Sequence, residues 1–157
     1  MEIQDIMAYL RLVAFDDDVS FKRIVNTPRR RFGRAKLQHV QMSQDGEKSL
    51  FATLKENIDD PVFKSSGVRE FIDVIERIRD IYSEIPLSEC VERICTESGY
   101  EKYIRELGDI ERFENLSEFK RIASEYEKNF GENVSLKEFI IKYHYNRRMT
   151  AKILTIW

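Results

Sequence analysis

Apolar residues recur along this chain at the three- and four-residue spacing that is typical of amphipathic helices. Near the N-terminus, Ile3, Ile6, Met7, Leu10 and Val13 follow this spacing and give one buried stripe. The same spacing predicts helices over residues 2–15, 19–25, 34–44, 49–58, 67–83, 88–98, 100–107 and 110–130, and from residue 135. Because no segment shows the alternation of a β-strand, we expect an all-α, compact bundle of about eight or nine helices.

Residues that stop or start helices lie between these segments. Asp16–Asp18 end the first helix and supply an N-cap for the second, and Pro28 ends the second. Ser135–Glu138 has the sequence of a capping box and opens the last helix. We therefore expect one helical domain over residues 1–140. Residues 141–157 are less periodic, and we expect a basic C-terminal tail that could continue the last helix, pack as an extended arm or lack fixed structure.

Charge is distributed very unevenly, although the net charge is only −2. Seven basic residues and no acidic one lie between Val19 and Gln44, whereas residues 45–138 contain 14 lysines and arginines against 23 acidic residues. One basic element on an acidic body would offer a local patch to a phosphate backbone and be repelled elsewhere. The charge pattern thus favours an oriented contact with nucleic acid.

The basic residues centre on residues 21–37, which we predict to form a helix–turn–helix element. The turn spans Pro28–Gly33, and Gly33 would leave the first backbone N–H groups of the next helix open to an anion. Arg30, Arg31 and Arg34 could add charge-assisted hydrogen bonds to neighbouring phosphates. The same arginines could instead be a solvated surface or pair with the acidic body, and composition alone leaves these alternatives open.

Other chemistry is absent from the sequence. No glycine is followed by Lys-Ser or Lys-Thr, which excludes a P-loop. His39 and His144 have no partner at a metal-binding spacing, and the spacing of Cys90 and Cys95 fits neither a zinc nor a redox motif, so we expect buried thiols in a cytoplasmic protein. No apolar run is long enough to cross a membrane. We therefore expect no catalytic residues, metal or membrane partner.

Four motifs in order then suggest a family. They are the opening EIQDIMAYLRLVAFDDDVSFKRIVNTPRRRFGRAKL, Ser98-Gly99-Tyr100, Arg112-Phe113-Glu114-Asn115-Leu116, and residues 136–140. Together they resemble the 2B subdomain of UvrD/PcrA/Rep-like superfamily 1 ATP-dependent DNA helicases over residues 2–140. The matching positions of the opening are Glu2, Ile3, Asp5, Ala8, Tyr9, Leu10, Arg11, Asp17, Asp18, Phe21, Arg23, Ile24, Asn26, Pro28, Arg30, Gly33 and Leu37.

The resemblance implies a helical insertion in a RecA-like motor domain, whose RGIG turn contacts the duplex ahead of the fork while the subdomain swivels. Its partners would be the backbone of duplex DNA, without sequence preference, and the helicase motor domains. The DNA-binding residues would be Thr27, Arg29, Arg30, Arg31, Phe32, Gly33, Arg34 and Lys36. Arg31 and Phe32 depart from the family pattern, because they replace the first glycine and the isoleucine of GIG. The close backbone approach that this glycine allows would be lost.

The resemblance also implies that ATP and Mg²⁺ belong to motor domains, whose Walker motifs are missing from this sequence, so we expect no catalysis by the chain alone. An excised subdomain and the product of a truncated gene both fit. Two other functions stay open at this point. The chain could be a protein-interaction or autoregulatory module, or a remnant with no present activity.

Overall fold

The computed structural model describes residues 2–131 and 134–148, with only the backbone described for residues 145–148. The described residues form nine α-helices, one short 3₁₀ helix and no strand, which confirms the predicted all-α fold. In chain order these are α1 (Glu2–Phe15), α2 (Asp18–Ile24), α3 (Arg34–Ser43), α4 (Leu50–Glu56), η1 (Pro61–Phe63), α5 (Val68–Ile81), α6 (Leu87–Glu97), α7 (Tyr100–Leu107), α8 (Ile110–Phe130) and α9 (Leu136–Arg148).

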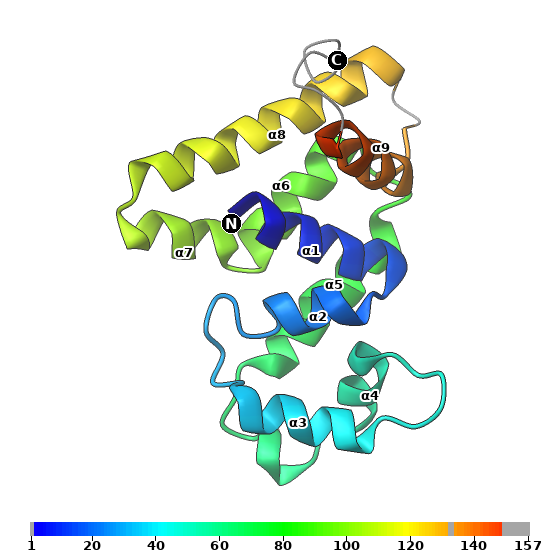
Figure 1. Ribbon diagram of the computed structural model, residues 1–157, viewed down its shortest axis with the longest axis vertical. Coiled ribbons are helices and arrows are strands. Elements are labelled where there is room, and N and C mark those ends of the chain that lie inside the picture. The colour runs from blue at the N-terminus through cyan, green and yellow to red at the C-terminus, as the bar shows by residue number, and fades with distance from the viewer. Residues whose placement is uncertain (1, 132–133, 149–157) are drawn as a thin grey trace.

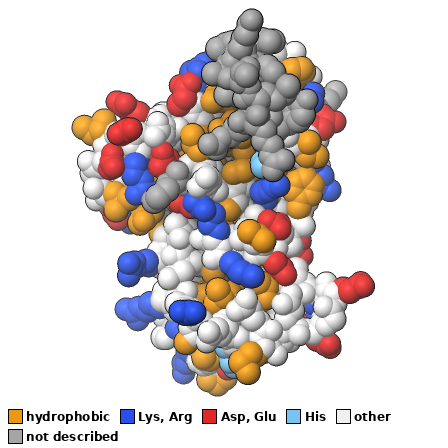
Figure 2. Space-filling model, in the orientation of Figure 1, with side chains coloured by type: hydrophobic (Ala, Val, Ile, Leu, Met, Phe, Trp, Pro, Cys, Tyr) orange, Lys and Arg blue, Asp and Glu red, His pale blue; other side chains and the backbone are white. Residues whose placement is uncertain are grey.

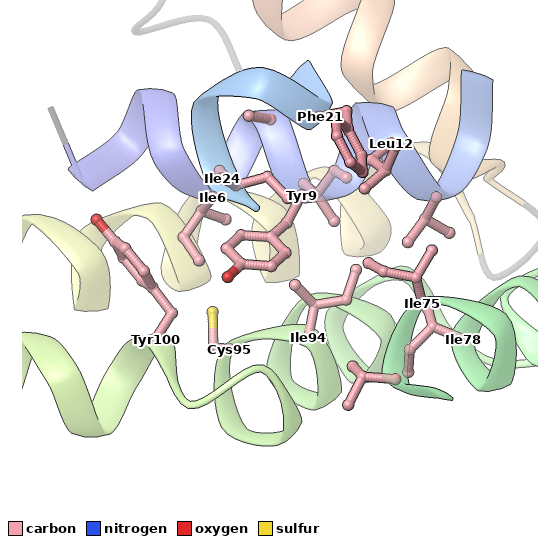
Figure 3. Packing of buried hydrophobic residues seen from close by; sticks show 14 of the residues in the cluster. Ile6, Tyr9, Leu12, Phe21, Ile24, Ile75, Ile78, Ile94, Cys95 and Tyr100 are labelled. Atoms are coloured by element: carbon pink, nitrogen blue, oxygen red, sulfur yellow. The ribbon is translucent and has the colours of Figure 1, made fainter. Parts of the chain in front are cut away.

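Helix α1 is the centre of the fold. It packs against α2, α5, α6, α8 and α9, with α8 toward one end of the molecule and α3 and α4 at the other (Figure 1). Figure 3 shows the core that results, in which Ile6, Tyr9 and Leu12 of α1 meet Phe21 of α2 and Ile94 of α6. The Tyr9 hydroxyl of this covered helix donates to the Thr27 carbonyl oxygen, and α1 thereby helps to fix the position of the α2–α3 loop.

Helix ends are held by the side chains that the sequence indicates. The Asp17 carboxylate accepts a hydrogen bond from the backbone N–H of Ser20 at 3.1 Å, which confirms the predicted N-cap of α2. The Ser135 hydroxyl accepts one from the backbone N–H of Glu138 at 3.0 Å, and this is one of the two bonds of a capping box.

The last helix extends beyond the predicted domain. Helix α9 continues to Arg148, so residues 141–148 continue the last helix, which is one of the three alternatives left open for this segment. Residues 149–157, the remainder of that segment, lie outside the described residues. None of the described helices is both long enough and apolar enough to span a bilayer.

Both cysteines are buried in α6, as predicted. Burial raises the pKa of each thiol, Cys90 and Cys95, to about 12. Since the thiolate is the reactive form, we expect a disulfide reagent such as DTNB at pH 8 to leave the folded protein unmodified and to label both thiols in denaturant. Stoichiometric labelling of the native protein within minutes would contradict this burial.

Candidate nucleic-acid interface

The loop between α2 and α3 has a defined path. The amide oxygen of Asn26 accepts hydrogen bonds from the backbone N–H groups of Arg30, at 2.7 Å, and Phe32, at 3.1 Å. The Tyr9 hydroxyl donates to the carbonyl oxygen of Thr27 from the core side, and the Thr27–Pro28 peptide bond is cis. One asparagine and one tyrosine therefore hold the backbone of the predicted DNA-binding turn.

Arg30 points into the protein. Its guanidinium Nη1 donates to the carbonyl oxygens of Ile24 and Val25 at 2.9 and 3.0 Å. Its Nη2 donates to the Tyr9 hydroxyl at 2.7 Å and to the Ser98 carbonyl at 3.1 Å. The sequence pattern placed Arg30 with the other arginines of the turn, but the structure gives it a different environment.

Phe32 also points inward and is 2% exposed. Its ring stacks on Phe63 of η1 with 5.8 Å between the ring centroids and an angle of 18° between the planes. His39 of α3 contacts the same Phe63 ring edge-on. Its Nε2 lies 3.0 Å from an Asp60 carboxylate oxygen. These contacts fasten the turn to η1 and to the first half of α3.

The outward face of the turn is basic. Arg29, Arg31 and Arg34 are exposed, and within the described part of the chain no carboxylate pairs with them. Lys36 is half-buried, and its Nζ donates to the carbonyl oxygen of Arg31. Figure 2 shows Lys and Arg side chains projecting from the edge of the molecule at which the α2–α3 loop and the start of α3 run in Figure 1. We call Arg29, Arg31, Arg34 and Lys36 the basic turn surface.

Lysines and arginines on the acidic body, residues 45–138, form ion pairs with carboxylates more often than those of the basic turn surface do. On the helices of the acidic body, Arg93 lies 3.2 Å from Glu89, and Arg121 bonds both Glu118 and Glu125. This contrast bears on the alternative that the arginines of the turn pair with the acidic body. Among the described residues such pairing is found on the body and not at Arg29, Arg31 or Arg34.

The start of α3 adds open backbone donors to this surface. Gly33 is its N-cap and provides no side-chain hydrogen bond, so the first N–H groups of this ten-residue helix have no side-chain cap. A Cβ atom at Gly33 would meet nothing within 4 Å, so the space beside it is open. Open N–H groups and the positive end of the helix dipole favour an anion at this position.

Comparison with known proteins identifies the family. Residues 1–152 match the model of the UvrD-like helicase C-terminal domain. The chain belongs to this family. An ATP-dependent DNA helicase PcrA from Staphylococcus epidermidis (strain RP62A) is 32% identical over 136 residues, which are 82% of this chain and 18% of that protein. A PcrA helicase from Staphylococcus aureus (strain Mu50) is 30% identical over the same shares. The chain thus spans about a fifth of the length of these relatives.

Two of the sequence motifs noted above contact α1. The Asp5 carboxylate accepts from the Tyr100 hydroxyl at 2.7 Å and from Arg23 Nε at 2.8 Å, and it is largely buried. Burial raises the pKa of the Tyr100 hydroxyl, and its bond to Asp5 raises it further. Sequence reasoning gave Asp5 and Tyr100 no role, although both lie in the matched motifs.

At the other end of α1, the Glu2 carboxylate accepts from Asn115 Nδ2 at 2.7 Å and from Arg112 Nε at 3.3 Å. Burial alone would raise the pKa of Glu2, but the pKa is lowered overall, chiefly through a hydrogen bond from its own backbone N–H and also through those from Asn115 and Arg112. The segment Arg112–Leu116 therefore attaches α8 to the first turn of α1. Among the described residues, no group of three His, Cys, Asp or Glu side chains is arranged to hold a metal ion.

Arg31 occupies a backbone conformation that favours glycine. Its φ of 57° lies in the left-handed region. We expect Arg31→Gly to be more stable than Arg31→Ala by about 1 kcal/mol, because only the alanine carries a Cβ into this conformation. Urea denaturation of the two variants, which lack the same charge, measures the difference. Equal stabilities would show that this φ imposes no strain.

Proposed function

We propose that this chain is the 2B accessory subdomain of a UvrD/PcrA-like ATP-dependent DNA helicase and that its basic turn surface contacts the backbone of duplex DNA during unwinding. The observation that carries the proposal is the environment of Arg29, Arg31 and Arg34. These three guanidinium groups face solvent beside a helix N-terminus with no side-chain cap, and no described carboxylate neutralises them. Family membership supports the helicase context.

The proposed contact is with phosphates and is independent of sequence. Arginine forks form charge-assisted bonds to phosphate oxygens, and the open N–H groups of α3 suit the same anion. Phosphate contacts position a protein on a duplex but carry little base information. The acidic helices of the body would be repelled by the backbone, so the turn would approach the duplex in one orientation.

ATP chemistry is assigned to the motor domains of a longer protein. No glycine of this chain is followed by Lys-Ser or Lys-Thr, so its residues do not fit a nucleotide phosphate cradle. In this proposal the motor domains are the protein partner, and the chain contributes duplex contact alone.

The test is duplex binding by the triple variant Arg29→Ala/Arg31→Ala/Arg34→Ala. Each lost phosphate contact should flatten the slope of log affinity against log salt by about 0.9, so we expect a slope smaller by roughly 2.7. Affinity at low salt should fall by about 10- to 100-fold. Fluorescence anisotropy of a labelled duplex between about 50 and 200 mM salt measures both quantities.

The matched control is a second triple variant that loses three arginines from the acidic body. Arg93, Arg105 and Arg121 are exposed and pair with carboxylates on their own helices, and the variant with alanine at all three should bind duplex with the slope of the wild type. If the turn variant also keeps the wild-type affinity and slope, the turn is not the DNA site. Binding to cognate motor domains without any duplex binding would instead favour the protein-interaction module.

A further inference from the structure

The environment of Arg30 separates it from the arginines beside it. Four hydrogen bonds join its two Nη atoms to protein oxygens, and these atoms carry four of the five N–H donors of a guanidinium. Its Cζ lies 4.7 Å from the centre of the Phe71 ring, so one face of the group is covered by an aromatic side chain. A phosphate would have to displace these partners, whereas Arg29 and Arg31 need displace only water.

The oxygens around Arg30 belong to the ends of two helices. Ile24 and Val25 are the last residue and the C-cap of α2, and Ser98 is the C-cap of α6. Helix C-termini carry partial negative charge and unpaired carbonyl groups, so one cation satisfies both ends at once. Arg30 therefore joins the end of α2 to the α6–α7 junction. Its partner there, Ser98, is 68 residues away from Arg30 in sequence.

Arg30 also holds the loop through its own backbone and its tyrosine partner. Its carbonyl oxygen accepts from the backbone N–H of Gly67 at 2.8 Å, directly before α5. Tyr9, which is 0% exposed, accepts from Arg30 and donates to the Thr27 carbonyl. At the α6–α7 junction, a Cβ built on Gly99 would lie 3.7 Å from Pro28, so this junction packs close to the loop as well.

We propose that Arg30 is a positioning residue that fixes the loop so that Arg29, Arg31 and Arg34 face the duplex together, and that it is not itself a phosphate ligand. This inference rests on the proposed function and assigns one arginine of the turn a different role. It also gives a role to the Ser98-Gly99-Tyr100 motif, whose first carbonyl receives the guanidinium.

Lysine at position 30 distinguishes charge from geometry. Lysine keeps the positive charge, but its single ammonium group cannot reproduce the planar fork that reaches oxygens of α2, Tyr9 and Ser98 together. A phosphate ligand would tolerate Arg30→Lys, whereas a positioning residue would not. Tyr9→Phe is the second variant, because Tyr9 is fully buried and cannot touch DNA, yet its hydroxyl joins Arg30 to Thr27.

The experiment combines duplex binding at several salt concentrations with amide hydrogen exchange of residues 26–33 in the full chain. For Arg30→Lys and Tyr9→Phe we expect about 3- to 10-fold weaker duplex binding, a salt slope equal to that of the wild type, and faster exchange of the Phe32 N–H. Circular dichroism confirms that the helices are retained. The triple variant at positions 29, 31 and 34 is measured in parallel.

Each outcome decides the proposal. If Arg30→Lys binds and exchanges like the wild type while Arg30→Gln flattens the slope by about 0.9, Arg30 is a phosphate ligand and the inference is wrong. Unchanged exchange in both Arg30→Lys and Tyr9→Phe also overturns it. If the triple variant keeps the wild-type slope, the proposed function itself fails, and the inference fails with it. If the triple variant has a flatter salt slope while Arg30→Lys binds and exchanges like the wild type, the proposed function stands and only the inference about Arg30 is wrong.

Discussion

Replacing Phe32 with alanine is expected to lower the free energy of unfolding by about 3–4 kcal/mol. Phe32 is 2% exposed and stacks on Phe63, which is also buried. Truncation removes the apolar ring and leaves a cavity between the loop, η1 and α3, and the surrounding backbone can fill it only in part. Urea denaturation followed by circular dichroism measures the loss.

Two comparisons give this prediction its controls. Phe32→Ile keeps most of the apolar volume, so we expect a loss of only about 1–1.5 kcal/mol. Phe15→Ala removes a ring that is 42% exposed, and its effect should be well below that of Phe32→Ala. If Phe32→Ala is as stable as the wild type, the ring is not part of the core.

Asp5→Ala is expected to cost about 3 kcal/mol of unfolding free energy. The substitution removes the acceptor of the Tyr100 hydroxyl, which is 0% exposed, and the anion that pairs with Arg23. The buried hydroxyl then loses its bond to the carboxylate, and Arg23 loses its ion pair with Asp5. Thermal or urea denaturation at neutral pH measures the effect.

A double-mutant cycle separates the Asp5–Tyr100 bond from other effects of the substitution. Tyr100→Phe removes the hydroxyl, so the Asp5→Ala/Tyr100→Phe protein should lose less stability than the sum of the two single variants, by about 1 kcal/mol. Asp73 is exposed on α5 and serves as a matched aspartate whose replacement by alanine should change stability by no more than about 0.5 kcal/mol. Strict additivity of Asp5→Ala and Tyr100→Phe would show that the two groups do not stabilise one another.

Much of the fold could be predicted because helices leave a local signal. The bounds predicted for α1, α7 and α8 agree with the structure, and those of α2 to α6 agree within two residues. The N-cap at Asp17 was also predictable, since its partner lies three residues away. The short helix η1 was missed, because three residues are too few to show a period.

The role of each residue in the turn could not be predicted in the same way. In an irregular loop the direction of a side chain depends on the φ and ψ of its own residue, and Arg31 has a positive φ that its side chain does not favour. The partners of Arg30 come from α1, the end of α2 and the end of α6, and Ser98 is 68 residues away. Charge density identified the surface, but only the tertiary structure distinguishes Arg30 from Arg29 and Arg31.

Side chains of this loop point alternately outward and inward, and this limits how the loop can change in sequence and length among homologues. Arg29 and Arg31 lie outside while Arg30 and Phe32 lie inside, so neighbouring positions face opposite environments. A substitution at an outward position changes the surface of the loop without removing a side chain from the core. An insertion or deletion of one residue before Arg30 would exchange the inward and outward positions of the loop. A different side chain would then lie against Ser98, and the Phe32 ring would be exposed. Homologous loops should therefore vary more in their outward side chains than in their length.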